Sequence, residues 1–354
     1  MNRIVHVASG REWRGGQHQV LLLARGLHRR GIATTVVTGA GTVLARRLED
    51  AQVPVEAVRW TGGLDPRVTV RVVRLLSSPA IVHVHDSHAH LLADLATRLR
   101  RAPIVVSRRV EFSIGSPRRL QRADAVIAIS ASVSRQVLAA GVSPDRVHLV
   151  PDAVDADVAP MDATTDEIAT ASRAPPLVVC VAALTREKGI DTLLEAAALV
   201  HASNPTVRWR VIGEGSERKA LEARRERLGL GAVVDLPGGG SSATGAFRGA
   251  TLAVQPSRQE GLGSAVLQAL AIGVPVIASN AGGLADALAH GGGVLVPVDS
   301  PVELAGAVEH LLGNAAERAR LAAEGRAAAG YFSVDRLVER TVDVYRSVTH
   351  SPGN

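Results

Sequence analysis

Short apolar runs alternate with longer amphipathic stretches along most of the chain. The apolar runs are nearly continuous in Val, Ile, Leu and Ala, as expected for strands buried on both faces of a sheet. The stretches between them repeat apolar positions at helical spacing. In the first half, the predicted strands are Ile4–Ala8, Ala33–Val37, Val53–Val58, Ile81–His85, Pro103–Val106, Ala125–Ser130 and Val147–Val150, and the predicted helices are Gln17–Arg30, Val68–Leu76 and Ala131–Ala140. This alternation predicts an α/β protein with doubly wound parallel sheets.

The alternation is interrupted once, between Asp152 and Pro176, where no period is visible and Ala, Asp, Thr and Pro dominate. Such a segment is typical of a linker. A length of 354 residues favours two domains. We place the first domain at residues 1–160, the linker at 161–176 and the second domain at 177–333, followed by a helix over 334–350. In the second half, the predicted strands are Leu177–Ala182, Val207–Ile212, Val233–Leu236, Leu252–Val254, Pro275–Ser279 and Val294–Val296, and the predicted helices are Ile190–His201, Ser216–Leu228, Ala265–Ile272, Pro301–Leu312, Ala315–Ala329 and Val334–Val348.

Residues 254–283, VQPSRQEGLGSAVLQALAIGVPVIASNAGG, carry the most distinctive local pattern. A strand end leads into a glycine-rich loop, and a helix follows for which we expect Ser264 to be the cap. A further strand ends in a second glycine loop, Asn280–Gly283. Free N–H groups and the helix dipole suit an anion there, most often a phosphate. Glu260 in the first loop is better suited to accept hydrogen bonds from hydroxyl groups, such as those of a sugar.

The same stretch invites a second interpretation. No formally charged residue occurs from Gly261 to Ala285, a length that would allow a membrane span. Gln268, Pro275 and Asn280, together with several glycines, interrupt it. A buried helix–strand pair of a soluble α/β domain fits this composition better.

Composition narrows the class of protein. Aromatic residues make up only 2% of the chain, so its cores must consist of Val, Leu, Ile and Ala. The single cysteine, Cys180, excludes internal disulfides and fits a reducing compartment. The first residues, MNRIVHVASG, lack the apolar region of a signal peptide. We therefore expect a cytoplasmic protein.

The net charge of +6 is unevenly distributed. Residues 1–175 carry 23 Arg against 16 Asp or Glu, a net charge of +7, and the remainder carries 17 basic and 18 acidic residues, a net charge of −1. The positive first half predicts an anionic partner: an acidic acceptor, a lipid headgroup or the inner membrane surface. Nucleic acid is disfavoured because aromatic residues for base stacking are scarce and no nucleic-acid module is recognisable.

Only two of the 40 basic residues are lysines, Lys188 and Lys219. A lysine kept against such a bias suggests a need for its compact, point-like ammonium group. Lys188 stands in a turn between a predicted strand and a predicted helix, whereas Lys219 lies within a predicted helix and is expected to be solvated. A solvated position is the alternative for Lys188 as well.

The motif E-G-x-G, followed by a strand of the form A-x-G-x-P-V-I-A-S and a G-G loop, resembles the retaining glycosyltransferases of family four, the group 1 or glycogen-synthase-like glycosyltransferases. The resemblance implies the GT-B fold, in which two Rossmann-like domains face each other across a cleft, and a last helix that returns to the first domain. It also implies a nucleoside-diphosphate sugar as donor and no metal or other cofactor. It covers nearly the whole chain and is strongest over residues 177–298.

On this resemblance, the donor diphosphate is held by Lys188, with Arg186 standing in for an arginine that the family has at Ala183. Glu260 contacts the sugar, and Gln268 occupies the place of a second glutamate that contacts the ribose. The full set of expected donor-binding residues is Gly15, Gly16, Arg186, Lys188, Gly213, Glu260, Gly261, Leu262, Gly263, Ser264 and Gln268. Gly15 and Gly16 follow the first strand, where the spacing alone fits an ordinary strand–helix turn equally well.

In many relatives a histidine after the fifth strand faces the donor sugar, but Arg108 and Arg109 occupy that region here. Either the role is lost, or Arg109 or a histidine at the end of the fourth strand, His85 or His88, assumes it, because ligand sites lie beyond the carboxyl ends of parallel strands. The expected catalytic residues are accordingly Lys188, Glu260, Arg109 and His85.

Three other chemistries remain weaker. The histidine-rich segment IVHVHDSHAH, with His83, His85, His88 and His90, invites a zinc site, but its aspartate is displaced by one position from the known pattern. Asp155-Ala156-Asp157 forms a D-x-D that we attribute to coincidence in a linker. The segment Gly213-Glu214-Gly215 lacks the third glycine of a dinucleotide fingerprint, which disfavours NAD.

We therefore expect a metal-independent retaining glycosyltransferase that acts on a glycan or lipid-linked acceptor in bacterial surface polysaccharide or lipopolysaccharide synthesis. Two alternatives remain open. A GT-B sugar-nucleotide epimerase would bind the same donor without an acceptor, and a degenerate member would bind nucleotide and transfer nothing.

Overall fold

The structure, a computed structural model, describes residues 3–60, 65–154, 175–239 and 243–350. The chain forms two compact units. Unit 1 comprises residues 1–153 and 334–354, and unit 2 comprises residues 154–333. Most of the predicted linker, including the D-x-D at Asp155 and Asp157, lies outside the described residues.

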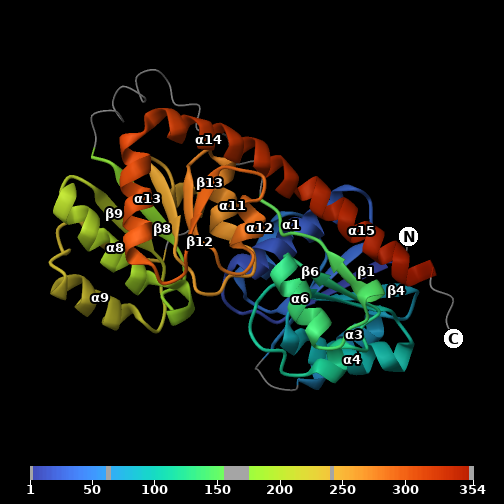
Figure 1. Cartoon of the computed structure of the whole chain (residues 1–354). Coiled ribbons are helices and arrows are strands. Elements are labelled where there is room, and N and C mark those ends of the chain that lie inside the picture. Colours follow the sequence, from blue (N-terminus) through green and yellow to red (C-terminus); the bar gives the residue numbers. More distant parts are fainter. Residues whose placement is uncertain (1–2, 61–64, 155–174, 240–242, 351–354) are drawn as a thin grey trace. The chain divides into compact units, whose positions relative to one another are not determined.

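Unit 1 contains a parallel sheet of seven strands in the order β3-β2-β1-β4-β5-β6-β7 (Figure 1). The strands are β1 (Arg3–Ala8), β2 (Thr34–Gly39), β3 (Val55–Val58), β4 (Ala80–Val84), β5 (Ile104–Arg108), β6 (Ala125–Ala128) and β7 (Val147–Leu149). The helices are α1 (Gly15–Arg29), α2 (Val43–Asp50), α3 (Pro66–Leu75), α4 (Ser87–Arg100), α5 (Pro117–Leu120), α6 (Ala131–Ala139) and α15 (Val334–His350), with a 3₁₀ turn η1 (Pro144–Arg146). The order reverses between β1 and β4, which makes their carboxyl ends the topological switch point.

Helix α15 packs against α1 within unit 1. Gly26 permits this close approach, because a Cβ there would collide with Val338. Tyr345 of α15 is fully buried in the same core as Leu22 and Ile81. The last helix of the chain is thus an integral part of the first unit's core.

Unit 2 contains a parallel sheet of six strands in the order β10-β9-β8-β11-β12-β13, with its own switch point between β8 and β11. The strands are β8 (Leu177–Val181), β9 (Arg208–Ile212), β10 (Val234–Gly238), β11 (Leu252–Gln255), β12 (Val276–Ser279) and β13 (Gly293–Val296). The helices are α8 (Ile190–Ser203), α9 (Arg218–Arg227), α10 (Ala243–Ala246), α11 (Ser264–Ala271), α12 (Leu284–Leu288), α13 (Pro301–Gly313) and α14 (Ala315–Ala329), with 3₁₀ turns η2 (Arg186–Lys188) and η3 (Gly330–Phe332). Its core is mostly aliphatic around one buried indole, that of Trp209.

The structure adds short helices that the periodicity did not reveal, among them α2, α5, α10 and α12. The segment 87–100 is a full helix, α4, capped by Asp86, whose carboxylate accepts from the Ala89 N–H at 2.8 Å. The predicted cap at Ser264 is wrong. Gly263 holds the N-cap position with a left-handed φ of 90°, and no side chain of the described residues caps this helix.

No helix within the described part of the chain combines the length and the apolar character needed to cross a membrane. The uncharged segment from Gly261 to Ala285 is divided among helix α11, strand β12 and the start of helix α12. Its apolar residues are buried in the fold of unit 2.

Candidate functional site

Lys188 and Glu260, both predicted to act on a donor, meet at the switch point of unit 2. Lys188 ends the turn after β8, and Glu260 lies in the loop after β11. Lys188 Nζ lies 2.8 Å from Glu260 Oε2, and the side chains retain 20% and 15% exposure. Ser257 Oγ donates to the same carboxylate oxygen at 3.3 Å. The pair is therefore positioned by the fold and still reachable from solvent.

The turn that carries Lys188 is fastened to the loop that carries Glu260. The backbone N–H groups of Arg258 and Gln259 both donate to the carbonyl of Glu187, at 2.8 and 3.2 Å. Gly189 has a left-handed φ of 64°, and a Cβ there would overlap the carbonyl of Pro256. Glycine is thus required both by the backbone conformation and by the close approach of the two loops.

Arg258 strengthens this connection with a side-chain network. Its guanidinium forms a two-pronged pair with Asp191 at 2.8 and 2.9 Å and contacts Asp299 at 2.7 Å. It also donates to the carbonyl of Arg186 at 2.7 Å. The hydrogen bond to Asp191 is the main cause that raises the pKa of Arg258. Burial works to raise the pKa of Asp191, but Arg258 lowers it on balance. Arg258 therefore ties the Lys188 turn, the start of α8 and the loop after β13 together.

The N-terminus of α11 has no capping side chain among the residues that the structure describes. Its first backbone acceptor, the carbonyl of Gly263, receives the N–H of Leu267 at 3.1 Å. The backbone N–H groups in the first turn of a helix have no partner within the helix, and they are therefore the groups that can bind an anion. The second glycine loop packs behind this turn, since Gly283 N–H donates to the Glu260 carbonyl at 2.8 Å and a Cβ on Gly283 would overlap Gly261. Leu262 is only 2% exposed and belongs to the buried part of this loop.

Two further predicted donor-binding residues, Gly213 and Gln268, also lie in unit 2. Gly213 follows β9, where a Cβ would overlap the carbonyl of Ala182, so the strand end requires glycine. Gln268 lies on α11 with its Oε1 buried and without a hydrogen-bond partner among the described residues. An unpaired buried acceptor of this kind favours a hydroxyl donor as its partner.

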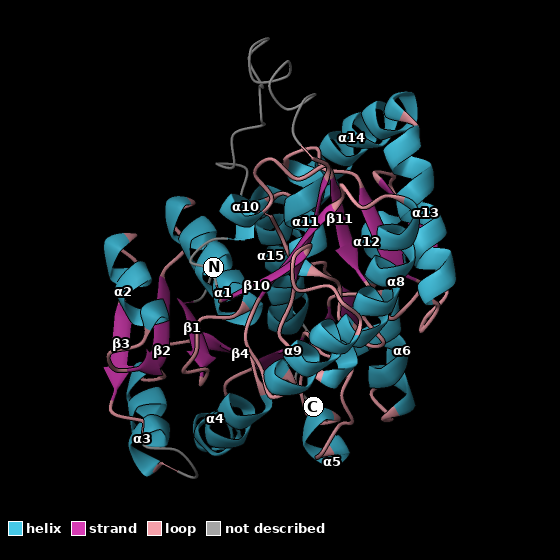
Figure 2. Cartoon of the chain, turned by 90° about the vertical axis from the view of Figure 1, so that its left-hand side faces the viewer, coloured by secondary structure: helices cyan, strands magenta, loops and turns pink. Residues whose placement is uncertain are grey.

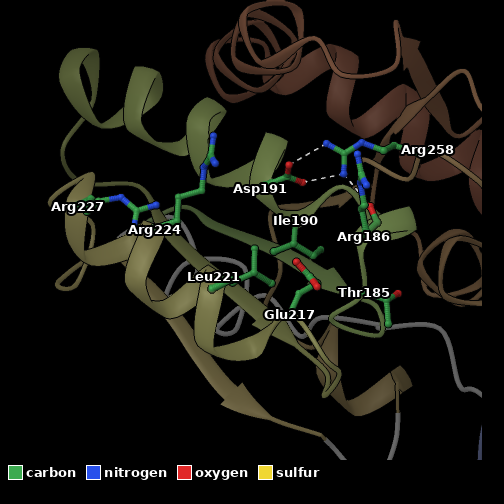
Figure 3. Close-up of a pocket in the computed structure, with 10 residues that line it drawn as sticks. Thr185, Arg186, Ile190, Asp191, Glu217, Leu221, Arg224, Arg227 and Arg258 are labelled. Carbon is green, nitrogen blue, oxygen red and sulfur yellow. Dashed lines mark hydrogen bonds and ion pairs between the residues drawn. The ribbon is translucent and has the colours of Figure 1, made fainter.

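A pocket of about 170 Å³ adjoins the Lys188 turn (Figure 3). Asp191 and Arg258 form one side of it, and Ile190 and Leu221 lie near its centre. Arg186 lines this pocket, and its exposed side chain makes no hydrogen bond or ion pair with other residues that the structure describes. Its predicted role as a diphosphate ligand remains a proposal.

Cys180 lies close enough to Lys188 and Glu260 for both charges to influence its thiol. Burial is the larger effect and raises the pKa of the thiol to about 12. A thiol that stays protonated at neutral pH is a poor nucleophile. Cys180 is therefore part of the support beneath the pair and is unsuited to covalent chemistry.

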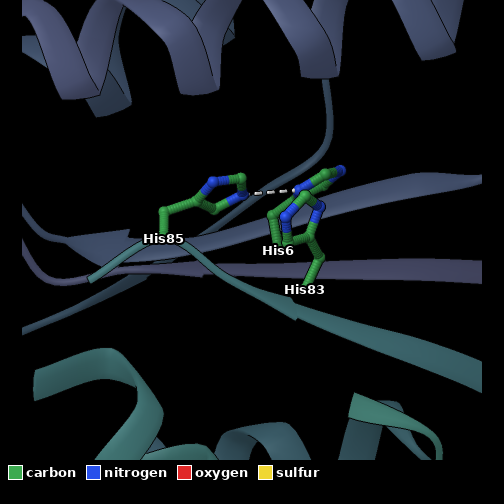
Figure 4. A group of neighbouring side chains, drawn as sticks. All are labelled: His6, His83 and His85. Atoms are coloured by element: carbon green, nitrogen blue, oxygen red, sulfur yellow. Dashed lines mark hydrogen bonds between the residues drawn. The ribbon is translucent and has the colours of Figure 1, made fainter. Parts of the chain in front are cut away.

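The switch point of unit 1 holds a second polar cluster. Gly15 and Gly16 begin α1 directly after the β1 loop, and a Cβ on Gly16 would meet nothing within 4 Å. His6 of β1 and His85 at the end of β4 are hydrogen-bonded through Nδ1 and Nε2 at 2.8 Å (Figure 4). His85 is only 9% exposed, so its ring is largely buried at the strand end.

Arg109 reaches this cluster from the end of β5. Its Nη1 lies 3.1 Å from His85 Nδ1, and its Nε donates to Asp152 Oδ1 at 3.0 Å. Since arginine can only donate, His85 accepts at Nδ1 and donates from Nε2 to His6. His6 then carries its own proton at Nε2, a buried atom without a hydrogen-bond partner among the described residues. The geometry therefore fixes both rings as neutral tautomers.

His83 completes the cluster with partners on both nitrogens, Tyr345 at 2.6 Å and Ser107 at 2.8 Å. Burial is the main cause that lowers the pKa of His83 and His85 well below the usual value, and it lowers that of His6 to about 3. The nearby Arg109 charge adds to all three shifts.

The predicted zinc set is not the set that the structure assembles. His6, His83 and His85 each offer a ring nitrogen within 4.8 Å of the others, whereas the His88 ring lies tilted against that of Trp60, with 5.5 Å between the ring centroids. The nitrogens of His83 and His85 are already hydrogen-bonded, and the Arg109 cation stands beside His85. These contacts fit a hydrogen-bonded cluster better than a metal centre.

Several residues of these sites escaped the sequence analysis. Arg258 and Asp152 are single charges in loops, and His6 lies inside an apolar strand, so no periodicity marks them. The composition predicts that Asp152 begins a linker, yet the residue is buried, with 4% exposure, and its side chain forms an ion pair with Arg109. Burial is the main cause that raises the pKa of Asp152, and the pair with Arg109 offsets it in part.

Comparison with known proteins gives two family matches. Residues 163–328 match the family described as glycosyl transferases group 1, and residues 13–158 match glycosyltransferase family 4. The chain is 35% identical over 278 residues to a D-inositol 3-phosphate glycosyltransferase of Geodermatophilus obscurus, covering 73% of this chain and 60% of that protein. It is 30% identical over 322 residues to D-inositol 3-phosphate glycosyltransferase 1 of Catenulispora acidiphila, covering 80% and 77%. The chain spans only 58% to 60% of the length of the Geodermatophilus obscurus protein and of the D-inositol 3-phosphate glycosyltransferases of Nocardiopsis dassonvillei and Xylanimonas cellulosilytica.

Among solved structures, Alr3699/HepE of Anabaena in complex with UDP-glucose superposes with a TM-score of 0.84. The two share 20% identity, and the match covers 98% of this chain and 100% of that one. Together with the two parallel sheets described above, this likeness confirms the predicted fold class, α/β of the GT-B type.

Proposed function

This chain belongs to the group 1 glycosyl transferases, and we propose that it moves a sugar from a nucleoside-diphosphate sugar to an acceptor hydroxyl. The observation that carries the proposal is the Lys188–Glu260 pair beside the uncapped N-terminus of α11. One place in unit 2 thus combines a cation and free N–H groups, which suit a diphosphate, with a carboxylate, which suits sugar hydroxyls.

The chemistry follows from how charge develops. Breaking the bond between the sugar and the diphosphate places negative charge on the leaving diphosphate. Lys188 and the N–H groups of the α11 first turn would stabilise that charge more strongly than the ground state, which accelerates the step. A bound diphosphate would compete with Glu260 for the three N–H donors of Lys188, which leaves the carboxylate available to the sugar.

We propose that the reaction retains the anomeric configuration and requires no metal, as the family resemblance implies. Retention can be read directly from the anomeric proton coupling of the product by NMR. Metal independence predicts full activity after treatment with a chelator. Gln268, with its unpaired buried Oε1, is the proposed contact to the ribose.

The acceptor is proposed to be anionic. Unit 1 carries 25 Arg against 14 Asp or Glu, a net charge of +11, whereas unit 2 carries 15 basic and 20 acidic residues, a net charge of −5. Such a field attracts negative partners. A glycan or lipid-linked acceptor of surface polysaccharide synthesis, at an anionic membrane surface, fits it. The acceptor in the relatives' names, an inositol phosphate, is anionic as well.

A thermal-shift panel with UDP, GDP, ADP, TDP, CMP and NAD tests the donor site. A ligand at a hundred times its dissociation constant stabilises the protein by about 2.7 kcal/mol. We expect one nucleoside diphosphate to exceed the others, and UDP is the first candidate because the Anabaena structures were solved with it. A uniform lack of response would contradict the donor site. Conversion of the donor without added acceptor to another sugar nucleotide would indicate an epimerase instead.

A further inference from the structure

A groove of about 520 Å³ lies between strand β3 and helix α3 of unit 1. Four arginines line it, Arg59, Arg67, Arg71 and Arg74, together with apolar residues that include Val58 and Val70. β3 is the outermost strand of the sheet among the described residues. Figure 2 shows α3 beside it, on the opposite face from α2.

Three of the arginines form one stripe on α3. Arg67, Arg71 and Arg74 stand at i, i+4 and i+7, which places them on the same side of a helix. Val68 and Val72 lie on a different face of the helix and are fully buried. The packing of the apolar face therefore aims the basic face along the groove.

The carboxylates nearby do not balance these charges. Arg67 pairs with Asp65 at 2.8 Å, and Arg71 contacts Glu56 at 3.1 Å. The exposed side chains of Arg59 and Arg74 have no ion pair or hydrogen bond with any residue in the described part of the chain. The groove therefore retains two uncompensated positive charges.

The position of the groove relates it to the switch point of the same sheet. Arg59 follows the carboxyl end of β3, and β3 is separated from β1 only by β2. Neighbouring strands lie about 4.8 Å apart, so the groove begins roughly 10 Å from the end of β1. From Arg67 to Arg74 the helix extends the charged wall by about 10 Å. An elongated ligand that starts at the switch point can continue into the groove.

We propose that this groove binds a linear oligosaccharide bearing carboxylate or phosphate groups, which is the extended acceptor of the proposed transferase. The inference rests on the proposed function for its role as acceptor. Guanidinium groups match carboxylate and phosphate oxygens in two-pronged geometry, and the apolar side chains suit the ring faces of sugars. The charges line a hollow, and a flat bilayer would engage a protruding surface instead.

Binding of hexagalacturonate, a linear hexasaccharide with a carboxylate on each unit, tests the groove in the full-length protein. The variant Arg59→Ala/Arg74→Ala removes the two unpaired charges. Arg100→Ala/Arg135→Ala is the matched control, since both residues are exposed in unit 1, lie outside the groove and carry the same charge. At low ionic strength we expect binding by the parent protein, binding weakened about tenfold or more in the groove variant, and unchanged binding in the control. Neutral maltohexaose should not bind.

Three outcomes would overturn the proposal. The first is an equal weakening of hexagalacturonate binding in both variants, and the second is no binding of hexagalacturonate by the parent protein. The third is a groove variant that still binds hexagalacturonate but no longer binds phosphatidylglycerol vesicles. The last result would indicate a membrane partner. The thermal shift with UDP should be the same in all three proteins, because it reports on unit 2. A normal UDP response with a failed groove test rejects the groove alone, whereas groove binding without any nucleotide response rejects the transferase and leaves an anionic glycan site.

Discussion

The two sheets of this protein each place a polar cluster at the same topological position, but the clusters differ in exposure. In unit 1, His6 and His83 are fully buried, and Arg109 is held between His85 and Asp152. In unit 2, Lys188 and Glu260 form one ion pair that stays partly exposed beside an uncapped helix. In the unit 1 cluster most polar groups are hydrogen-bonded to one another, whereas in the unit 2 cluster a cation and N–H groups remain available to a ligand.

The comparison shows that a position at a switch point does not by itself define a binding residue. Buried groups that hydrogen-bond mainly to one another rigidify a strand end and set the orientation of the side chains beside them. Partly exposed groups with a partner that a ligand can displace are suited to binding. On this basis Arg109, whose side chain is only 9% exposed and is held by Asp152 and His85, belongs with His6 and His83 to the supporting cluster.

The largest expected effect concerns acid stability, which should be governed by unit 1. Because the folded-state pKa values of His6, His83 and His85 lie below the unfolded value of about 6.5, the unfolded chain binds more protons. Their contribution is fully present above pH 6.5 and is lost as the pH falls, down to about pH 3 for His6. Each fully buried histidine can contribute up to about 1.4 kcal/mol per pH unit in this window.

Denaturant unfolding between pH 7 and 5 measures this loss. His6→Gln should reduce the pH slope, and the exposed His310→Gln should leave it unchanged. Asp152, whose pKa is raised by burial, acts in the opposite sense, because the folded protein then holds a proton that the unfolded chain releases. A slope that is unaffected by His6→Gln would mean that the cluster is not neutral when folded.

The second prediction concerns the exposed cluster. Lys188→Ala should lower turnover on the order of a hundredfold or more, because it removes a fixed cation from the leaving diphosphate. Lys219→Ala changes the only other lysine, which is exposed on α9, and serves as the charge-matched control. Steady-state kinetics with a saturating donor measures the turnover of both variants. Near-normal turnover of Lys188→Ala would remove the residue from the catalytic set.

The third prediction tests whether the unit 2 cluster is also held in place by its surroundings. Arg258→Ala breaks the contacts to Asp191 and Asp299 and should lower turnover about tenfold. Arg258→Lys keeps the charge but loses the two-pronged pair, so we expect an intermediate effect. Turnover that falls while UDP affinity is unchanged would identify positioning of Lys188 and Glu260. Unchanged turnover in Arg258→Ala would show that the loops keep their positions without it.

The smallest expected effect is at Gln268, where the family pattern has a glutamate. Gln268→Glu should strengthen UDP binding by roughly threefold to tenfold, since a carboxylate accepts hydroxyl hydrogen bonds more strongly than an amide. Calorimetric titration of UDP measures this change. Gln268→Leu is the counterpart and should weaken binding. Equal affinities in all three proteins would place the ribose elsewhere.

Much of the fold followed from local patterns. Strand β1 and helix α1 were predicted within a few residues, and α14 was predicted with its bounds as observed. Buried parallel strands have a nearly continuous apolar pattern, and the glycine loops that end them need conformations that other residues avoid. Lys188 and Glu260 could be singled out because each stands in such a loop.

Other features could not be predicted, because they depend on partners distant in the sequence. Arg258 finds Asp191 across 67 positions and Arg109 finds Asp152 across 43, pairings that no local period encodes. The cap of α11 also escaped prediction, since Ser264 is a good cap by residue type but the left-handed backbone of Gly263 takes that place.

The sequence by itself determined the strands, most of the longer helices, the loops that carry ligand chemistry and the family, because each of these depends on residues close together in the chain. Tertiary structure decided which polar groups are buried and paired with one another and which remain available to a ligand. His85 and Lys188 both follow parallel strands, yet one is buried among histidines and the other stays partly exposed. Strand order and side-chain packing bring distant residues together, and the resulting burial and pairing separate a supporting cluster from a binding one.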